Sequence, residues 1–218
     1  MFRECDLVYI SAIIPAFNEE STIANVLNTL KMADNINEII VVSDGSTDDT
    51  ALISRRCGAR VVELPQNRGK GAAIKAGLNI CRGDIILLLD ADLVGLKTVH
   101  VESLLKPVAA ARSDMAVGVF SNGRFSTDMA QKITPQLSGQ RAVRKWILDR
   151  MANLELSGYG VEVALTRYAE EENIPVLFVE LADLTHITKE EKLGFFRGFA
   201  QRLKMYWEIL KGLSLARR

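Results

Sequence analysis

The first half of the chain alternates between short runs of large aliphatic residues and segments whose apolar residues recur at helical spacing. The aliphatic runs predict strands, and they occupy residues 8–14, 38–43, 60–64 and 85–89. The segments between them predict helices, the first of which carries Ile23, Val26, Leu27 and Leu30 on one face. The run at 85–89 is aliphatic throughout, which indicates a strand buried on both faces, as in a parallel sheet. This alternation predicts an α/β fold with a mostly parallel central sheet, right-handed crossovers and helices on both faces.

The second half of the chain is less regular. A helix is predicted over residues 96–112 and a strand over 115–120, followed by a polar stretch from Ser121 to Gly139 that has no strong periodicity. A loop of this length in a compact domain is usually a functional lid or disordered. Beyond it the pattern predicts helices and one late strand, and the chain ends in a long amphipathic helix. These helices span residues 140–153, 161–172 and about 189–213, and the strand spans 175–181.

Composition narrows the class of protein. The chain has 218 residues, enough for one sizeable domain or one domain with an appendage. Lys plus Arg number 27 and Asp plus Glu number 27, so a broad basic surface for nucleic acid is excluded. The three cysteines lack metal-ligand spacing and fit a reducing compartment. No signal-peptide core is visible and no apolar run approaches the ~18 residues of a membrane span. We therefore expect a cytoplasmic protein, with peripheral membrane contact as the alternative.

Two carboxylates follow the buried strand. Asp90 and Asp92 flank the small Ala91, and alternation along an extended chain places both on the same side of the backbone. Like charges this close repel unless a cation or a proton compensates, so a divalent metal carrying a phosphorylated ligand is a natural partner. The alternative is a loop whose aspartates cap the next helix. Ligands of open α/β sheets bind outside the carboxyl ends of the strands, where residues 15–19, Asp44 and Lys70 are also expected. The expected convergence of these residues at one edge of the sheet favours a metal site over a helix-capping loop.

Four ordered motifs carry a resemblance to a known family. They are Ile-Ile-Pro-Ala-Phe-Asn-Glu-Glu (13–20), Asp-Gly-Ser-Thr-Asp (44–48), Asn-Arg-Gly-Lys-Gly (67–71) and Asp-Ala-Asp (90–92). In order and spacing they resemble family 2-type nucleotide-sugar glycosyltransferases, which implies a Rossmann-like nucleotide-diphospho-sugar transferase (GT-A) fold. A shorter second match, over residues 137–141, 158–162 and His186, resembles glucosyl-3-phosphoglycerate synthases and their relatives.

The resemblance implies roles at the donor side. Asp92 would bind Mg²⁺ or Mn²⁺ together with His186, while Asp90 would hydrogen-bond the ribose or complete the water shell of the metal. Hard cations prefer such oxygen ligands, and a metal stabilises the leaving diphosphate. Asp44 would accept a hydrogen bond from a uracil imide. Ser43 replaces the commoner aspartate before it, so uridine is the first choice among bases rather than the sole one. The remaining donor contacts would come from Pro15, Ala16, Phe17, Glu19, Lys70 and Ala91.

The acceptor side is implied by the second match. Arg141, expected at the N-terminus of a helix, would bind an anionic acceptor such as a phosphorylated acid. The alternative for Arg141 is a surface cation on an exposed helix. Glu162 would be the catalytic carboxylate beside Asp92: a general base if the enzyme inverts, or a holder of hydroxyl groups if it retains configuration. Glu155 competes for this role. The other expected acceptor contacts are Ser138, Gly139, Gln140 and Tyr159.

Domain organisation and function follow as expectations. Residues 1–188 would form the transferase domain, with a donor-binding half (8–120) and an acceptor half (121–188) that contains a flexible loop (121–139). Residues 189–218 would form a C-terminal amphipathic helix that packs on the domain or on a second copy in a homodimer. The alternative is docking on anionic lipid, which would favour a polyprenyl phosphate acceptor.

The expected activity is metal-dependent transfer of a hexose, first choice glucose from UDP-glucose, to a hydroxyl of a small phosphorylated acceptor. A nucleotidyltransferase is a second class, but those enzymes usually carry a glycine-rich loop after the first strand, where this chain has Pro-Ala-Phe-Asn-Glu. A non-catalytic sugar-nucleotide binding protein is a third class. The presence of Asp90, Asp92 and His186 together argues against it.

Overall fold

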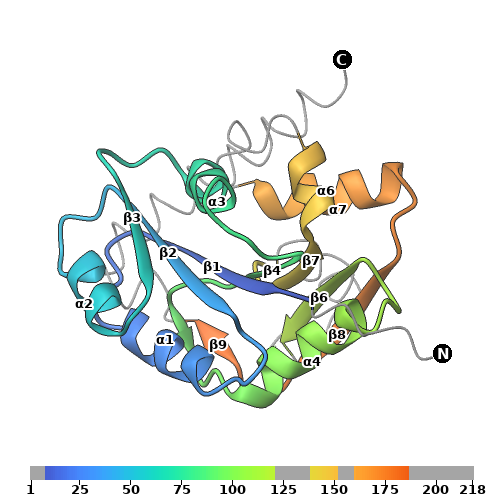
Figure 1. Cartoon of the computed structure of the whole chain (residues 1–218), viewed down its shortest axis with the longest axis horizontal. Coiled ribbons are helices and arrows are strands. Elements are labelled where there is room, and N and C mark those ends of the chain that lie inside the picture. Colours follow the sequence, from blue (N-terminus) through green and yellow to red (C-terminus); the bar gives the residue numbers. More distant parts are fainter. Residues whose placement is uncertain (1–7, 121–137, 152–159, 187–218) are drawn as a thin grey trace, which may run out of the picture.

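The computed structural model describes residues 8–120, 138–151 and 160–186. Within these ranges a seven-stranded sheet has the strand order β3-β2-β1-β4-β7-β6-β8 (Figure 1). Neighbouring strands pair in parallel except around β7, which runs antiparallel to both β4 and β6. The predicted α/β class with a mostly parallel sheet is therefore confirmed. The strands are β1 (Ile10–Ala16), β2 (Glu38–Asp44), β3 (Arg60–Leu64), β4 (Ile85–Leu88), β6 (Met115–Phe120), β7 (Arg141–Arg144) and β8 (Val176–Leu181).

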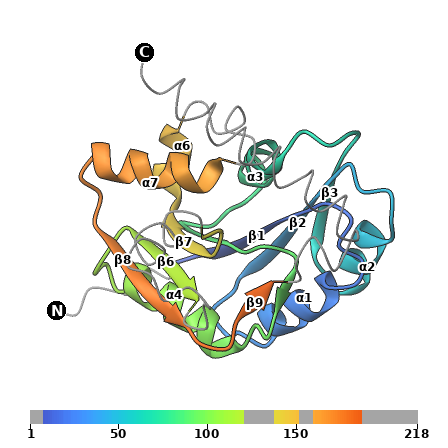
Figure 2. The same cartoon turned by 180° about the vertical axis from the view of Figure 1, so that it is seen from behind.

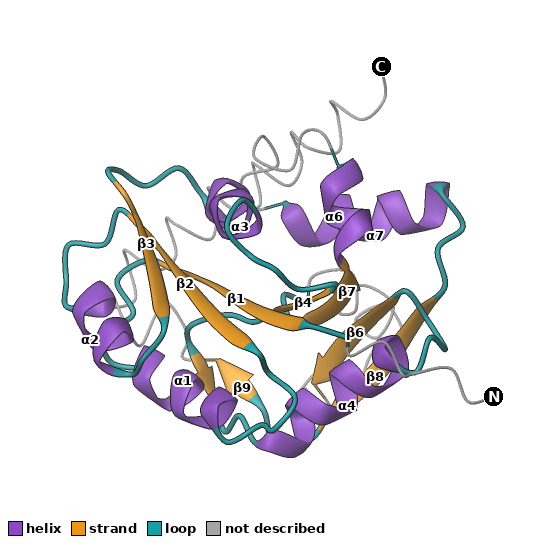
Figure 3. Ribbon diagram, in the orientation of Figure 1, coloured by secondary structure: helices purple, strands orange, loops and turns teal. Residues whose placement is uncertain are grey.

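Helices cover both faces of this sheet, as Figures 1 and 2 show from opposite sides and Figure 3 shows by element type. One face carries α1 (Ile23–Lys31), α2 (Thr50–Arg56) and α4 (Thr98–Ala109). The other carries α3 (Lys70–Leu78), α6 (Lys145–Arg150) and α7 (Val161–Glu171). Among the helices of the described ranges, none has the length and hydropathy that crossing a bilayer requires.

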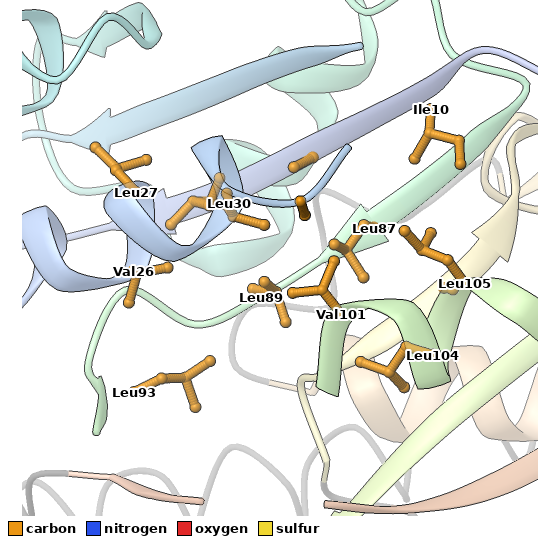
Figure 4. Close-up of a cluster of buried hydrophobic side chains, with 14 of the residues drawn as sticks. Ile10, Val26, Leu27, Leu30, Leu87, Leu89, Leu93, Val101, Leu104 and Leu105 are labelled. Atoms are coloured by element: carbon orange, nitrogen blue, oxygen red, sulfur yellow. The ribbon is translucent and has the colours of Figure 1, made fainter. Parts of the chain in front are cut away.

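Alternation along the strands builds a separate core on each face. Ile10 and Ile14 of β1 point to the α1 and α4 side, whereas Ile13 between them points to α3. Figure 4 shows the first core, where Leu27 and Leu30 of α1 and Val101 and Leu104 of α4 meet the sheet. Burying each such side chain stabilises the fold by about 1.5–3 kcal/mol. The sheet is thus held rigidly from both sides, and its strand ends form a fixed platform.

The prediction of one helix over residues 140–153 is wrong in its first part. Residues 141–144 form strand β7, and the helix spans only Lys145–Arg150, while residues 152 and 153 lie outside the described residues. The backbone groups of β4 and β6 need hydrogen-bond partners, and β7 supplies them to both neighbours. Ala142 and Val143, both fully buried, lie in the two opposite cores, so a short apolar pair here serves a strand.

The first strand was predicted to end at residue 14, before Pro15, but β1 continues to Ala16 and Pro15 pairs with Val42 of β2. The ladder between β1 and β4 ends earlier, at Ile13 and Leu88. A proline is tolerated at this point because only one neighbouring strand still pairs there.

Acidification should weaken the fold through His100, which lies in the first turn of α4. His100 is buried, and its Nδ1 accepts a hydrogen bond from the backbone N–H of Lys97 (3.2 Å). Burial, together with the charge of Lys97, lowers the pKa of His100 below its ordinary 6.5. The unfolded chain therefore takes up a proton below about pH 6.5 that the folded chain resists, and the free energy of unfolding falls with pH by up to about 1.4 kcal/mol per unit.

Urea unfolding at neutral pH and at about pH 5 measures this effect. A His100→Gln variant keeps a side-chain acceptor for Lys97 but cannot titrate, so its stability should fall less on acidification than that of the wild type. Equal losses in the two proteins would show that His100 is not the group responsible.

Candidate functional site at the carboxyl edge of the sheet

The loops after β1 and β2 hold each other at the carboxyl edge of the sheet. Asn18 Oδ1 accepts a hydrogen bond from the backbone N–H of Thr47 (2.8 Å). Glu20 bonds two neighbouring residues of the second loop: its carboxylate accepts from Asp49 N–H (3.0 Å), and its own N–H donates to the Asp48 carboxylate (3.1 Å). The two loops therefore form one wall, beside which Phe17 is exposed.

Asp44, at the end of β2, fixes the loop that leads into α3. Its two carboxylate oxygens accept hydrogen bonds from the backbone N–H groups of Arg68 and Gly69, both at 2.8 Å. The same loop packs against Gly45, which has φ +70° and where an added Cβ would lie 2.4 Å from the Asn67 nitrogen. Asp44 thus places the first residue of α3, Lys70, at the sheet edge. The predicted contact of Asp44 with a nucleobase stays a prediction, and this positioning role was missed by sequence reasoning.

Lys70 lies between two acidic side chains from distant parts of the chain. Its ammonium donates to Asp90 Oδ1, which follows β4, and to Glu162 Oε1 in the first turn of α7 (2.5 Å). The side chains of Lys70, Asp90 and Glu162 are 18%, 22% and 12% exposed. Burial alone would lower the pKa of Lys70, but the charges of Asp90 and Glu162 and the hydrogen bonds to both outweigh it, and the pKa lies above its ordinary value. Lys70 is therefore a fixed positive charge at the centre of the site.

The segment before β7 closes over this cluster. Gln140 is fully buried and its amide donates to Asp90 Oδ2 (2.8 Å), while its own Oε1 accepts from the Ser138 hydroxyl (3.0 Å). Gly139, between them, faces the ion pair: an added Cβ would lie 2.5 Å from Asp90 Oδ2 and 2.6 Å from Lys70 Nζ. Two of the predicted acceptor residues, Gly139 and Gln140, therefore lie against predicted donor-binding residues.

Replacing Gly139 by alanine should lower activity more than stability. The new methyl group must push apart Asp90 and Lys70, and a displacement of this size in a site costs about a hundredfold in turnover. The measurement is kcat for nucleotide release together with the Tm. Gly58→Ala is the control. Gly58 has φ +78°, so an alanine there is strained, but Gly58 lies in the turn after α2, far from Gly139 in the sequence. An added Cβ at Gly58 would have only Lys31 Nζ within 4.0 Å. Gly58→Ala should lower the Tm and leave kcat unchanged. Equal kcat values for Gly139→Ala and the wild type would contradict the close approach of Gly139 to Asp90 and Lys70.

Arg141 is not where the sequence placed it. It belongs to strand β7 rather than to a helix N-terminus, and it is fully buried rather than a surface cation. Its Nε donates to the Ser138 carbonyl (2.8 Å). Burial lowers the pKa of Arg141 to about 10, against the favourable charge of Glu162. Both sequence-based interpretations of its environment, the helix N-terminus and the exposed helix, are therefore wrong, and its contact with an acceptor remains without support from this geometry.

A small second sheet brings the late segment of the chain to the Asp-Ala-Asp loop. Strand β5 (Leu93–Val94) pairs antiparallel with β9 (Thr185–His186), and Leu93 is the direct partner of His186. Asp92, half-buried, immediately precedes this pairing. The backbone of His186 therefore runs beside the segment that carries Asp92, as a shared metal site requires. In the part of the chain that the structure describes, no group of three His, Cys, Asp or Glu side chains is placed to hold a metal by itself.

The other predicted site residues divide into two groups. Pro15, Ala16 and Glu19 lie at or just after the end of β1, and Ala91 is buried between the two aspartates. These residues keep their predicted donor-binding roles as predictions. Tyr159, Glu155 and most of the loop 121–139 lie outside the described residues, as does the predicted helix from residue 189 onward with its dimer and membrane contacts.

A family profile matches the region that builds this edge. Residues 11–152 match the profile of glycosyl transferase family 2. The chain belongs to this family. The match includes β1, β2, β4 and the Asp-Ala-Asp loop, together with β7. The expected family 2 resemblance is confirmed.

Individual family 2 relatives refine the comparison. The chain is 30% identical over 193 residues to glucosyl-3-phosphoglycerate synthase of Mycobacterium tuberculosis (strain H37Rv), a match that covers 72% of this chain. It spans 59% of the length of that curated relative. It is also 40% identical over 95 residues to undecaprenyl-phosphate 4-deoxy-4-formamido-L-arabinose transferase of Edwardsiella ictaluri, which covers 39% of this chain and 29% of that protein.

Solved family 2 structures match over a larger share of the chain. The M. tuberculosis glucosyl-3-phosphoglycerate synthase in complex with Mn²⁺, UDP-glucose and phosphoglyceric acid superposes with a TM-score of 0.71 at 26% identity, covering 94% of this chain and 79% of that one. The same enzyme with Mn²⁺, UDP and glucosyl-3-phosphoglycerate gives 0.70 at 27% identity, covering 86% and 75%. The GT-A fold expected from the sequence is confirmed by these matches.

Proposed function

We propose that this protein is a metal-dependent glycosyltransferase that moves glucose from UDP-glucose to a hydroxyl of a small phosphorylated acceptor. The observation that carries the proposal is the convergence of Lys70, Asp90 and Glu162 at the carboxyl edge of the sheet, beside the loop that holds Asp92. Support comes from the M. tuberculosis relative, whose structures contain UDP-glucose, phosphoglyceric acid and Mn²⁺.

The proposed binding of the sugar donor rests on the positive charge of Lys70. Lys70 uses two of its three N–H donors on Asp90 and Glu162, so the third is available to an oxygen of the donor diphosphate. Its raised pKa keeps it charged at all physiological pH values. A fixed cation here stabilises the negative charge that grows on the diphosphate as the sugar leaves. The wall formed by the loops after β1 and β2 would hold the base and ribose.

The residues present fit a divalent metal. Asp92 offers carboxylate oxygens and His186 an imidazole on the neighbouring strand, a donor set suited to Mn²⁺ or Mg²⁺. Phosphate oxygens of the donor and water would supply the remaining ligands of such a metal. When bound, the metal would neutralise charge on the leaving diphosphate. Asp90 is already bonded to Lys70 and Gln140, so we assign it to orienting Lys70 rather than to the metal.

Glu162 is the carboxylate best placed to meet the acceptor. It lies in the first turn of α7, 92 residues from Lys70 in the sequence, and shares the Lys70 ammonium with Asp90 of the Asp-Ala-Asp loop. Its second oxygen is the group that we propose orients or deprotonates the acceptor hydroxyl. Whether transfer inverts or retains configuration decides between these two roles.

A lipid-linked acceptor is the second candidate, favoured by the match to the undecaprenyl-phosphate transferase. That match covers 39% of this chain, compared with 72% for the glucosyl-3-phosphoglycerate synthase. A match of this extent fits shared donor chemistry, whereas the acceptor half decides between a soluble acid and a lipid phosphate. We therefore rank the small phosphorylated acceptor first.

The proposal is tested by incubating the protein with UDP-glucose or GDP-mannose, Mn²⁺ and either 3-phosphoglycerate or undecaprenyl phosphate. Release of the nucleotide diphosphate and the mass of the product are measured, with a chelator as the control. We expect UDP release and a glucosylated small acid that disappears with chelator. A glucosylated lipid would select the second candidate, and no release from any donor would contradict transferase activity.

A further inference from the structure

We propose that Arg141 is a positioning residue that holds helix α7, and with it Glu162, against the donor edge of the sheet. The inference deepens the proposed function and rests on it for the role of Glu162. Arg141 is among the largest fully buried side chains of the described residues, and its predicted contact with an acceptor stays a prediction. Its contacts connect two elements of the site.

The guanidinium bonds two segments that are far apart in sequence. Its Nε donates to the carbonyl of Ser138, at the start of the segment that closes over Asp90 (2.8 Å). Its Nη2 donates to the hydroxyl of Thr166 in α7 (3.0 Å). That hydroxyl in turn donates to the backbone carbonyl of Glu162, one turn earlier (2.9 Å). Arg141 is thus tied through Thr166 to the residue that carries the acidic side chain.

These contacts complete a closed ring through the site. From Glu162 the ring passes to Lys70 and Asp90, then through the Gln140 amide to the Ser138 hydroxyl, all by side-chain bonds. Arg141 joins the two ends, Ser138 and the first turns of α7. The tie reaches the first turn of α7 through the backbone carbonyl of Glu162. It therefore adds to the contact with Lys70 in fixing the position of Glu162.

An arginine at position 141 is better explained by a role in positioning α7 than by a contribution to the stability of the fold. A buried guanidinium is costly to desolvate, and an apolar side chain of similar volume often packs at lower cost. The planar fork of arginine, however, can bond a carbonyl and a hydroxyl at fixed angles, which neither an apolar side chain nor the point charge of lysine does. The burial that makes Arg141 costly also makes its contacts with Ser138 and Thr166 rigid.

Thr166→Val tests the tie with a nearly isosteric change, and Thr166→Ser is its matched control because serine keeps the hydroxyl. Under the proposal Thr166→Val lowers kcat by about tenfold, since small misplacements of a catalytic group are this costly, while KM for UDP-glucose and 3-phosphoglycerate stays within about twofold. Thr166→Ser restores most of kcat. Arg141→Met gives a loss at least as large, and the double variant Arg141→Met with Thr166→Val loses no more than Arg141→Met alone, because both changes break the same tie.

Other results would overturn the proposal. A raised KM for 3-phosphoglycerate in Arg141→Met with a silent Thr166→Val would assign Arg141 to the acceptor. A lower Tm with unchanged kcat in Thr166→Val would make the tie purely structural. Amide hydrogen exchange provides a readout without turnover: Thr166→Val should accelerate exchange in the first turns of α7 and not in β1 or β2. Unchanged exchange there would refute the tie, whereas an inactive wild type would refute only the proposed function.

Discussion

Replacing Asp92 with alanine should lower the rate of glucose transfer by about a thousandfold. Metal stabilisation of a leaving diphosphate contributes several kcal/mol, and about 4 kcal/mol corresponds to this factor. Asp92 immediately precedes the β5–β9 pairing, so we propose it as the carboxylate of the Asp-Ala-Asp pair that shares a metal with His186. The measurement is kcat for UDP release over a range of Mn²⁺ concentrations, with UDP binding followed by calorimetry with and without Mn²⁺.

The controls separate metal binding from loss of charge. Asp34→Ala removes an exposed carboxylate outside the site and should leave both kcat and the Mn²⁺ dependence unchanged. In Asp92→Ala, UDP binding should no longer gain from Mn²⁺. If that variant binds UDP with Mn²⁺ as tightly as the wild type, Asp92 is not a metal ligand.

Replacing Lys70 with methionine should abolish turnover and also destabilise the fold. The change leaves two acidic side chains, Asp90 and Glu162, close together without the cation between them. Breaking a buried ion pair in this way costs about 3–5 kcal/mol, and because these side chains are 12–22% exposed we expect about 2–3 kcal/mol. The free energy of unfolding in urea at neutral pH is the measured quantity, alongside kcat.

A second substitution and a control test whether repulsion between Asp90 and Glu162 causes the loss of stability in Lys70→Met. Adding Glu162→Gln to Lys70→Met removes one of the two repelling charges and should recover part of the stability but none of the activity. Arg55→Met breaks an exposed ion pair, in which the side chains of Arg55 and Glu63 are 49% and 53% exposed. It should change the free energy of unfolding by less than about 1 kcal/mol. A Lys70→Met variant as stable as Arg55→Met would show that the buried cluster does not form in solution.

The donor-binding half could be predicted from the sequence because its information is local. Aliphatic runs gave strands β1 to β4 to within about two residues, and strand order in a parallel sheet sends their carboxyl ends to one edge. Asp90 and Lys70 were therefore expected together before any geometry was known. The pairing of Lys70 with Glu162 was not, because Glu162 lies in a helix and is 92 residues away from Lys70 in the sequence.

The features that could not be predicted depend on contacts between residues far apart in the sequence. The residues of β7 were predicted as the start of a helix, since four residues are too few to outweigh the helical pattern that follows them, and only their pairing with β4 and β6 makes them a strand. The same error placed Arg141 at the N-terminus of a helix. The base contact of Asp44 stays a prediction, but its hydrogen bonds to two backbone N–H groups of a remote loop were not predicted from the sequence. The pairing of Leu93 with His186 joins two-residue strands that no periodicity reveals.

The most direct test of the account is a crystal of the protein soaked with UDP-glucose and Mn²⁺, in which anomalous scattering locates the metal. We expect the Mn²⁺ signal at Asp92 and His186, in contact with the diphosphate, with the Lys70 ammonium on the same phosphate groups and the uracil against the wall formed by the loops after β1 and β2. A metal or nucleotide bound away from this edge of the sheet would contradict the assignment of the site.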